Sequence, residues 1–301
     1  AEGASPAAPA AGAPSADAPA AGVPSADSPA AGAPDLPADV HIGRRASVCL
    51  GVSGSVAAVK APDLVRALLQ RGVSVDLILT NSACKLLHAS YHGAVPWEQL
   101  QRLAAEHGRG GSALASLEAS SCHKQAAAET TLTIWCDADE WSAYASVGDD
   151  QVVHVELAKR NQLLLIAPLC ANTLASAALG LCGSLLTCVL RAWYYDLDAA
   201  LAEPLARRAG AQAVNRPIVV APAMNTVMYH QRITATHLAA LTARGVHMVP
   251  PVSKLLACGD TGMGAMAPVD AVVDAALQFL QEHLAATEAE ARGDEAEGEL
   301  A

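Results

Sequence analysis

The sequence predicts a doubly wound α/β fold of the Rossmann or flavodoxin-like type, built on one parallel sheet. Residues 46–52 form a short apolar run, residues 56–71 carry apolar side chains at helical spacing, and residues 73–79 are rich in β-branched residues. Gly72 suits the end of the intervening helix. A strand, a helix and a strand in this order predict a right-handed crossover between parallel strands.

The remaining elements continue the alternation. Apolar runs at residues 163–167 and 217–221 predict buried strands, and each is followed by a polar turn and a helix-like segment. Residues 246–249 predict another strand, and residues 268–284 predict a closing helix whose first residue is Pro268. In such a sheet, ligands bind at the carboxyl ends of the strands, where these polar turns fall.

Composition divides the 301 residues into one domain and two tails. Residues 1–40 repeat an Ala- and Pro-rich phrase of ten residues, which predicts disorder because such side chains bury too little surface. Residues 288–301 predict a disordered acidic tail, so residues 41–287 form the single domain. Within it, residues 101–130 and 197–215 have weak periodicity and predict surface insertions.

Charge and cysteine usage exclude several classes of function. The net charge is −11, but each tail carries −5, which leaves about −1 on the domain and predicts no nucleic-acid or anionic-membrane partner. The eight cysteines include no Cys-x-x-Cys pair, so the sequence signals neither a zinc site nor a redox pair, and in a chain of this length they do not indicate a disulfide framework. Reduced thiols, and the absence of a signal-peptide pattern at the start, lead us to expect a cytoplasmic protein.

Residues 169–190 lack charge and are long enough to span a bilayer. Polar side chains, glycines and many alanines interrupt this stretch, so we interpret it as the end of a strand followed by buried helices.

Two turns early in the domain are candidate anion sites. Residues 51–58 (Gly-Val-Ser-Gly-Ser-Val-Ala-Ala) join the first strand to the first helix, where free backbone N–H groups can bind an anion. Ser53 and Ser55 could add hydroxyl donors to a monophosphate, although the segment matches neither glycine fingerprint of nucleotide-binding loops and an ordinary turn fits it equally well. Thr80 closes the second strand and is either a similar contact or a helix N-cap.

Five later residues are also candidates for the site. Asn172 and Thr173 follow the strand at 163–167, and Asn225 follows the strand at 217–221; each could instead simply cap a helix. His154 precedes a helix-like run and could be an ordinary buried histidine. Cys258 begins a glycine-rich stretch, residues 258–267, that suits neither helix nor strand and predicts a mobile flap.

Taken together, these stretches resemble the family of flavin-containing cysteine decarboxylases. The similarity covers about residues 46–100 and 132–284 and depends on several motifs in order. They are Gly-Val-Ser-Gly-Ser-Val-Ala-Ala at 51–58, Asp-Ala-Asp-Glu-Trp at 137–141, His-Val-Glu-Leu at 154–157, Ala-Pro-Leu-Cys-Ala-Asn-Thr-Leu at 167–174, Leu-Thr-Cys-Val-Leu-Arg-Ala-Trp at 186–193, Pro-Ala-Met-Asn at 222–225 and Lys-Leu-Leu-Ala-Cys-Gly-Asp-Thr-Gly-Met-Gly at 254–264.

The resemblance implies an FMN cofactor, a homotrimer with its site between subunits, and decarboxylation of 4′-phosphopantothenoyl-cysteine to 4′-phosphopantetheine in coenzyme A biosynthesis. It also implies oxidation of the substrate to a thioaldehyde, loss of CO2 and re-reduction of the resulting enethiol. The implied FMN contacts are Gly54, Ser55, Val56, Thr80, Ala171, Asn172 and Thr173.

By the same resemblance, His154 and Cys258 are catalytic: His154 handles a proton or steadies the carboxylate, and Cys258 protonates the enethiol. Asn225 binds the substrate carboxylate together with its neighbours Met224 and Ala223. A basic group on the substrate side could be Lys159 or Arg160.

One pair of residues departs from the family pattern, and one alternative function remains open. Gly183 and Ser184 stand where relatives usually carry Asp-Asn, which could change a helix cap, a flavin contact or the trimer interface. Related halotolerance flavoproteins with acidic tails act as inhibitory subunits of protein phosphatases, so a regulatory role is the alternative function. The joint presence of His154, Asn225 and Cys258 favours the enzyme. A nicotinamide-dependent enzyme is disfavoured because its glycine fingerprint is missing.

Overall fold

The structure is a computed structural model of the chain. It describes residues 46–108, 130–142, 144–147, 149–200, 202, 204, 215–255 and 261–298, with backbone only for 255, 261 and 290–298. The repeat segment 1–40, most of the two expected insertions and Cys258 lie outside the described residues.

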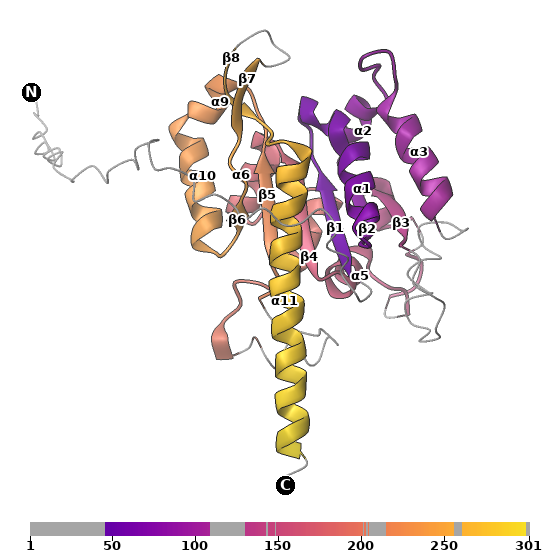
Figure 1. Cartoon of the computed structure of the whole chain (residues 1–301), viewed down its shortest axis with the longest axis vertical. Coiled ribbons are helices and arrows are strands. Elements are labelled where there is room, and N and C mark those ends of the chain that lie inside the picture. The colour runs from indigo at the N-terminus through magenta and orange to yellow at the C-terminus, as the bar shows by residue number, and fades with distance from the viewer. Residues whose placement is uncertain are drawn as a thin grey trace, which may run out of the picture. The chain divides into compact units, whose positions relative to one another are not determined.

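Six parallel strands form the central sheet in the order β3-β2-β1-β4-β5-β6 (Figure 1). The strands are β1 (Ser47–Val52), β2 (Ser74–Leu79), β3 (Leu132–Cys136), β4 (Leu163–Leu169), β5 (Ile218–Pro222) and β6 (His247–Met248). The order reverses between β1 and β4, which confirms the doubly wound α/β class and places the expected ligand crevice beside these two strands.

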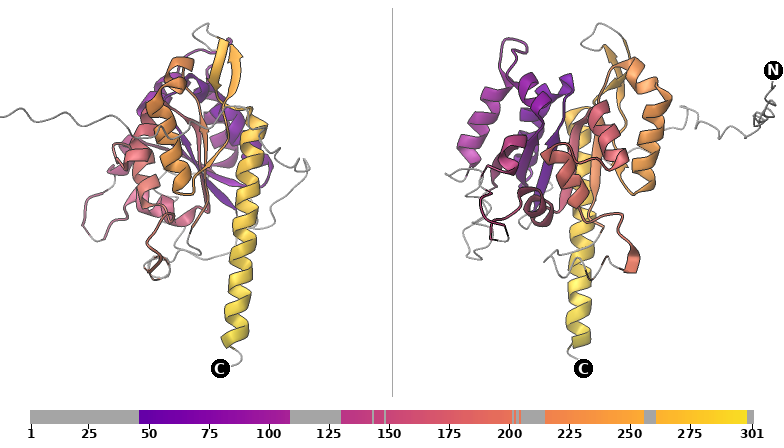
Figure 2. Two further views of the ribbon diagram at one scale, coloured as in Figure 1. Left: turned by 90° about the vertical axis from the view of Figure 1, so that its left-hand side faces the viewer. Right: turned by 180° about the vertical axis from the view of Figure 1, so that it is seen from behind.

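Helices cover both faces of the sheet (Figure 2). The helices α1 (Ala61–Gln70), α2 (Asn81–Leu87), α3 (Pro96–His107) and α11 (Val269–Gly298) contribute to one apolar cluster, and α5 (Val153–Arg160), α6 (Ala171–Leu179), α7 (Leu185–Ala192) and α10 (Arg232–Ala243) contribute to the other. Strand residues alternate between the clusters, with Leu50 in the first and Cys49 in the second. Both faces of the sheet are therefore dry, as parallel strands require.

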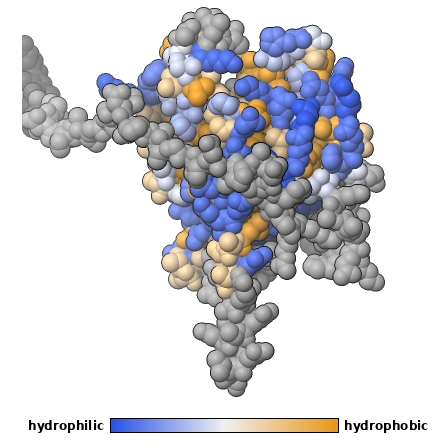
Figure 3. Space-filling model, in the orientation of Figure 1, coloured by the Kyte–Doolittle hydropathy of each residue, from blue (hydrophilic) through white to orange (hydrophobic). Residues whose placement is uncertain are grey.

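Three further short helical elements are described: the 3-10 helices η1 (Val56–Lys60) and η2 (Asp137–Glu140), and the helix α9 (Thr226–His230). Figure 3 shows hydrophilic residues interspersed with apolar ones on the face of the molecule that Figure 1 presents. Among the described residues, no helix combines the length and the apolar character that crossing a membrane requires. The uncharged stretch 169–190 is the end of β4 followed by α6 and α7, as expected.

Three features differ from the expectation: an additional strand, the start of an insertion and the end of the last helix. The strand β3 was not predicted, because five residues that directly follow an irregular stretch give too short a pattern to recognise. The helix α3 occupies residues to His107, so the insertion expected from residue 101 starts later. The closing helix α11 was expected to end at Leu284, but in the structure it continues to Gly298, through most of the acidic segment (Figure 2).

An antiparallel hairpin of β7 (Val252–Leu255) and β8 (Thr261–Ala265) follows the sheet. The sequence predicted that glycines would keep this stretch out of regular structure, and that prediction is wrong for Gly262 and Gly264, which lie in β8. A Cβ at Gly262 would lie 2.7 Å from the side chain of Thr226, and a Cβ at Gly264, where φ is +134°, would collide with the carbonyl of Met224. These glycines permit close packing of the strand.

Candidate functional site

Four polar turns follow β1, β2, β4 and β5, and they carry Ser55, Thr80, Thr173 and Asn225. Because the strands are parallel and adjacent, their carboxyl ends share one edge of the sheet. The structure thus places the candidate residues from four distant parts of the chain along a single edge.

The first turn suits close approach of a ligand to the backbone. Ser55 is the N-cap of η1, where its Oγ accepts from the N–H of Ala57 at 3.4 Å. Val56 beside it is half exposed, which is unusual for valine in this fold and offers an apolar surface. A Cβ at Gly54 would lie 2.5 Å from the Cβ of Ser82, so glycine is required where the turn meets α2.

Ser53 does not serve as the phosphate donor that was one possibility. Its side chain is fully buried, and its Oγ donates to the carbonyl of Pro168 at 2.7 Å and accepts from the N–H of Cys170 at 2.8 Å. Ser53 therefore ties the end of β1 to the end of β4, which fixes the base of the crevice, and leaves ligand contact to Ser55.

The next two turns are helix starts. Thr80 is the N-cap of α2, and its Oγ1 accepts from the N–H of Ala83 at 3.3 Å, so the capping interpretation is correct for this residue. The residue that caps α6 is Cys170, whose Sγ accepts from the N–H of Thr173 at 3.5 Å, so neither Asn172 nor Thr173 is the cap. Asn172 is exposed on the first turn of α6.

Asn225 lies where the hairpin packs against the end of β5. Its Oδ1 accepts from the N–H of Val227 at 2.8 Å, and it is the N-cap of α9. The preceding residues Ala223 and Met224 are buried, and the N–H of Met224 donates to the carbonyl of Gly264 at 2.9 Å. The hairpin whose sequence includes Cys258 is thereby anchored on the Asn225 turn. The position of Cys258 itself lies outside the described residues, so the expected convergence of His154, Asn225 and Cys258 stays a prediction.

His154 lies on the first turn of α5 and is held by a carboxylate. Its Nδ1 is 2.5 Å from Oε1 of Glu140, and the two side chains are 24% and 7% exposed. Oε2 of Glu140 is buried without a protein partner among the described residues. If the buried carboxylate is ionised, it accepts the Nδ1 proton, which leaves Nε2 as the ring nitrogen that can face a substrate. Glu140 belongs to the motif at 137–141, but its role could not be derived from the sequence.

A buried polar cluster connects the carboxyl-terminal end of α5 to β2. Asp76 on β2 accepts from Nε of Arg160 at 2.7 Å, from Nδ2 of Asn161 at 2.8 Å and from Nε1 of Trp135 at 3.0 Å. Arg160 is therefore committed to the core, whereas Lys159 pairs with Glu156 at 2.9 Å at the protein surface. Both basic candidates lie in the last turn of α5, beside the start of β1, where the carbonyl of Arg160 accepts from Oγ of Ser47 at 3.0 Å, so the structure places neither of them at the ligand edge of the sheet.

Arg216 secures the same carboxyl-terminal end of α5. Its Nη1 donates to the carbonyls of Ala158, Lys159 and Asn161 at 2.7 to 2.8 Å. Burial lowers the pKa of this guanidinium from its usual value. Sequence analysis did not single out Arg216 or Asp76, because an isolated charged residue in a sequence gives no sign of burial.

Gly183 and Ser184, which stand where relatives usually carry Asp-Asn, keep the N-terminus of α7 capped. Oγ of Ser184 accepts from the N–H of Thr187 at 3.3 Å, and the side chain of Thr187 accepts from the N–H of Ser184 at 3.0 Å. Asp137 also accepts from the N–H of Leu185 at 2.9 Å. The replacement of Asp-Asn by Gly-Ser therefore leaves the start of α7 satisfied.

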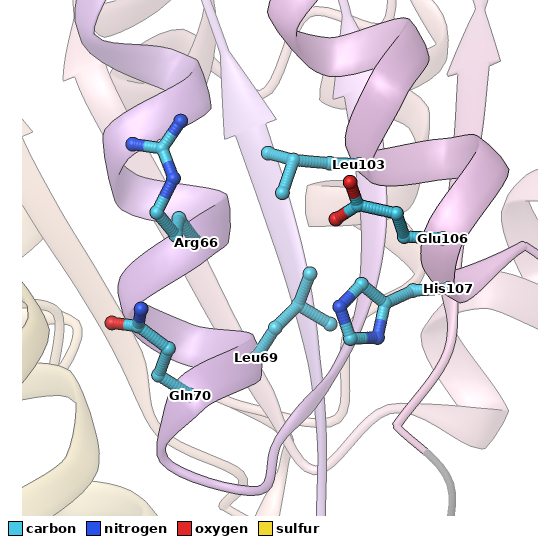
Figure 4. A pocket seen from close by; sticks show the side chains of 6 residues that line it. All are labelled: Arg66, Leu69, Gln70, Leu103, Glu106 and His107. Carbon is cyan, nitrogen blue, oxygen red and sulfur yellow. The ribbon is translucent and has the colours of Figure 1, made fainter.

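A hollow of about 230 Å³ lies elsewhere, between α1 and α3 (Figure 4). It is lined by Arg66, Leu69, Gln70, Leu103, Glu106 and His107. These residues occupy the carboxyl-terminal halves of their helices, toward the amino edge of the parallel strands and away from the four polar turns. We assign the candidate site to the turns, because they combine helix N-termini and an amide at the ligand edge of the fold.

The donor set of the four turns fits a flavin mononucleotide. Backbone N–H groups and the hydroxyl of Ser55 suit a phosphate, whereas the hydroxyl of Thr80 already donates to the carbonyl of Val52. Exposed apolar side chains at the same edge suit an aromatic ring system. These apolar side chains are Val56, Val227, Met228 and Met263. No group of three or more potential metal ligands was found among the described residues.

Fold and site together define a class: a doubly wound protein that binds a nucleotide-like cofactor at its switch point. The family model described as Flavoprotein matches residues 40–281. The chain belongs to the flavoprotein family, and the flavin is the cofactor of that class.

Relatives narrow the comparison to decarboxylases. The chain is 34% identical over 241 residues to phosphopantothenoylcysteine decarboxylase of Mus musculus, which covers 80% of this chain and 90% of the relative. It is 41% identical over 150 residues to the enzyme of the same name from Oryza sativa subsp. japonica, covering 50% of this chain and 59% of the relative. Both of these relatives are named for a decarboxylation.

Two solved structures agree with the fold. A PPC decarboxylase with a cysteine-to-serine substitution, complexed with pantothenoylaminoethenethiol, aligns with a TM-score of 0.56 and 32% identity, over 79% of this chain and 100% of that chain. The FMN binding protein AtHal3 aligns with a TM-score of 0.55 and 33% identity, over 79% and 98%.

Proposed function

We propose that this protein decarboxylates 4′-phosphopantothenoyl-cysteine to 4′-phosphopantetheine, a step of coenzyme A biosynthesis, with FMN as its cofactor. The observation that carries the proposal is the hairpin of β7 and β8 anchored on the Asn225 turn, because it joins the substrate-side amide to the segment that contains Cys258. The decarboxylase complexed with pantothenoylaminoethenethiol, which spans the same part of the fold, supports the substrate class.

We assign each residue the role that the family resemblance implies. The turns at Gly54–Val56, Thr80 and Ala171–Thr173 hold the cofactor by its phosphate and ring edge. FMN, when bound, supplies the reversible two-electron oxidation that makes the substrate carbon an electron sink. Asn225 orients the carboxylate that leaves as CO2, and Cys258 returns a proton to the enethiol.

His154 handles a proton or steadies the carboxylate through Nε2, because Nδ1 is engaged by Glu140. Glu140 does not touch substrate in this proposal. It is a positioning residue that sets the tautomer and orientation of the imidazole.

The test incubates the purified full-length protein with 4′-phosphopantothenoyl-cysteine and measures 4′-phosphopantetheine and CO2 by mass. We expect product from the wild-type protein and none from His154→Asn, with equal flavin absorbance in both. A yellow protein that forms no product would overturn the substrate assignment, and a colourless protein that takes up no FMN would overturn the cofactor assignment.

A regulatory flavoprotein is the second candidate. Relatives from Malus domestica and Glycine max carry the designation HAL3 within their decarboxylase names, which links the two classes by name. Inhibition of a purified protein phosphatase by the chain, together with no decarboxylation, would favour this candidate over the enzyme.

We also propose a cytoplasmic homotrimer whose sites lie between subunits. The exposed side chains of Trp141, Leu179 and Leu181 support this proposal, because a subunit interface would remove their apolar surface from water. Light scattering coupled to size-exclusion chromatography gives the subunit number, and a monomer that decarboxylates at full rate would contradict the shared site.

A further inference from the structure

A pair of thiols lies behind the Thr80 turn, outside the proposed catalytic groups. Sγ of Cys84 on α2 is 3.8 Å from Sγ of Cys136, the last residue of β3, and both side chains are partly buried. The two residues are 52 positions apart in the chain, so the contact is created by the fold.

We propose that Cys84 and Cys136 form a redox-active dithiol that hydrogen peroxide converts to an intramolecular disulfide. A disulfide requires the sulfurs to approach to about 2.05 Å, which from their present contact needs rotation about side-chain bonds. The contact also identifies the partner, because the sulfur of Cys136 already lies 3.8 Å from that of Cys84.

The local charges assign different roles to the two thiols. The contact with Cys136 lowers the pKa of Cys84 to about 7, burial and Asp137 oppose this, and nearby His88 lowers it further. The same contact raises the pKa of Cys136, and burial, Asp137 and Asp139 add to that rise. Cys84 is therefore the thiolate that reacts first, and Cys136 is the protonated thiol that resolves it.

The chemistry balances in two steps. The Cys84 thiolate attacks one oxygen of hydrogen peroxide, the O–O bond breaks, and hydroxide leaves to take up a proton as water, which gives a sulfenic acid. The sulfur of Cys136 then attacks the sulfur of that acid, the S–O bond breaks, and the departing hydroxide takes the Cys136 proton as a second water. Two thiols lose two electrons in total, and one peroxide is reduced to two waters.

Cys84 and Cys136 lie on α2 and β3, and a hydrogen bond from Asn81 to Asp137 already connects these two segments. Asp137, the residue after Cys136, accepts from the N–H of Asn81 at 3.4 Å and from the N–H of Leu185 at 2.9 Å, so it connects the starts of α2 and α7. A disulfide at Cys84 would add a covalent link between β3 and α2 at the same place. It would act beside Thr80, the cap of α2.

The test treats the reduced full-length protein with hydrogen peroxide at increasing pH, then counts free thiols and maps disulfides by mass spectrometry without reduction. We expect loss of two of the eight thiols and a cross-linked Cys84–Cys136 peptide, formed several-fold faster above pH 7 than at pH 6, since the thiolate forms as pH rises through the pKa of about 7. No substrate is involved, so the outcome is independent of the proposed decarboxylation.

Two variants make the result specific. In Cys136→Ser, oxidised Cys84 has no resolving thiol, so a sulfenic-acid probe such as dimedone should label it strongly, whereas wild type should show little label. Cys182→Ser is the matched control, because Cys182 is exposed and would react first if exposure alone decided; it should leave the cross-link unchanged. A first disulfide between any other cysteines, or equal dimedone labelling of wild type and Cys136→Ser, would overturn the proposal.

Discussion

Replacing Glu140 by Gln tests whether the partner of His154 acts through the charge of its carboxylate. The substitution keeps the shape of the side chain and the contact with Nδ1, 2.5 Å away, but removes the buried charge. A hydrogen bond to a charged group contributes about 1.5–3 kcal/mol, against about 1 kcal/mol for a neutral one. If the transition state carries an imidazolium at His154, the difference of about 0.5–2 kcal/mol corresponds to a loss of kcat of roughly 2- to 30-fold.

Stability should change little in the same variant. Oε2 of Glu140 is buried without a described partner, so the wild-type carboxylate already bears a desolvation cost that the neutral amide reduces. Urea unfolding should therefore place Glu140→Gln within about 1 kcal/mol of wild type, whereas Glu140→Ala opens a cavity and leaves the imidazole without its acceptor.

The assay measures CO2 release at saturating substrate, with flavin content from absorbance and with the pH profile of kcat. Glu156→Gln is the matched control, because Glu156 lies on the same helix and pairs with Lys159 at the surface. It should retain kcat within a factor of about two, since surface ion pairs contribute little. An unchanged kcat and pH profile in Glu140→Gln, or an equal loss in Glu156→Gln, would refute the positioning role.

Three further predictions concern the flap, the hairpin and the core. Cys258→Ser should still release CO2 but should accumulate the oxidised enethiol; a normal yield of 4′-phosphopantetheine, measured by mass, would remove Cys258 from the mechanism. Gly264→Ala should lower kcat/KM at least tenfold, because it places a Cβ against a backbone carbonyl at a residue with positive φ. The control Gly183→Ala should leave kcat/KM unchanged, because a Cβ there meets no atom. Equal kinetics in the two variants would refute the anchoring of the hairpin. Asp76→Ala should lower the free energy of unfolding in urea by about 3–5 kcal/mol, because it leaves the buried Arg160 without its carboxylate. The control Asp63→Ala removes the exposed partner of Arg66 and should lower that free energy by less than about 1 kcal/mol. Similar losses in the two variants would contradict the buried network.

The doubly wound class, most strands and the edge that carries the site could be predicted from the sequence. Apolar periodicity reports burial along one segment, and the turn after each buried strand must fall at the carboxyl edge of a parallel sheet. The residues Ser55, Thr80, Asn172, Thr173 and Asn225 were found in this way.

The pairing of distant side chains could not be predicted, because it depends on which strands are neighbours. Ser53 looked equivalent to Ser55, yet only the adjacency of β1 and β4 commits its hydroxyl to Pro168 and Cys170. Gly264 looked like part of a mobile flap, and only its approach to Met224 shows why a strand needs glycine there.

The sequence by itself thus determined the order of the elements and the chemical types available at the ligand edge, since both follow from local pattern. Only the tertiary structure decided that Glu140 holds His154, that Arg160 rather than Lys159 enters the core, and that Cys84 meets Cys136. The physical reason is that hydrogen bonds and ion pairs act over a few ångströms in space, while the residues that form these three contacts are 14, 84 and 52 positions apart along the chain.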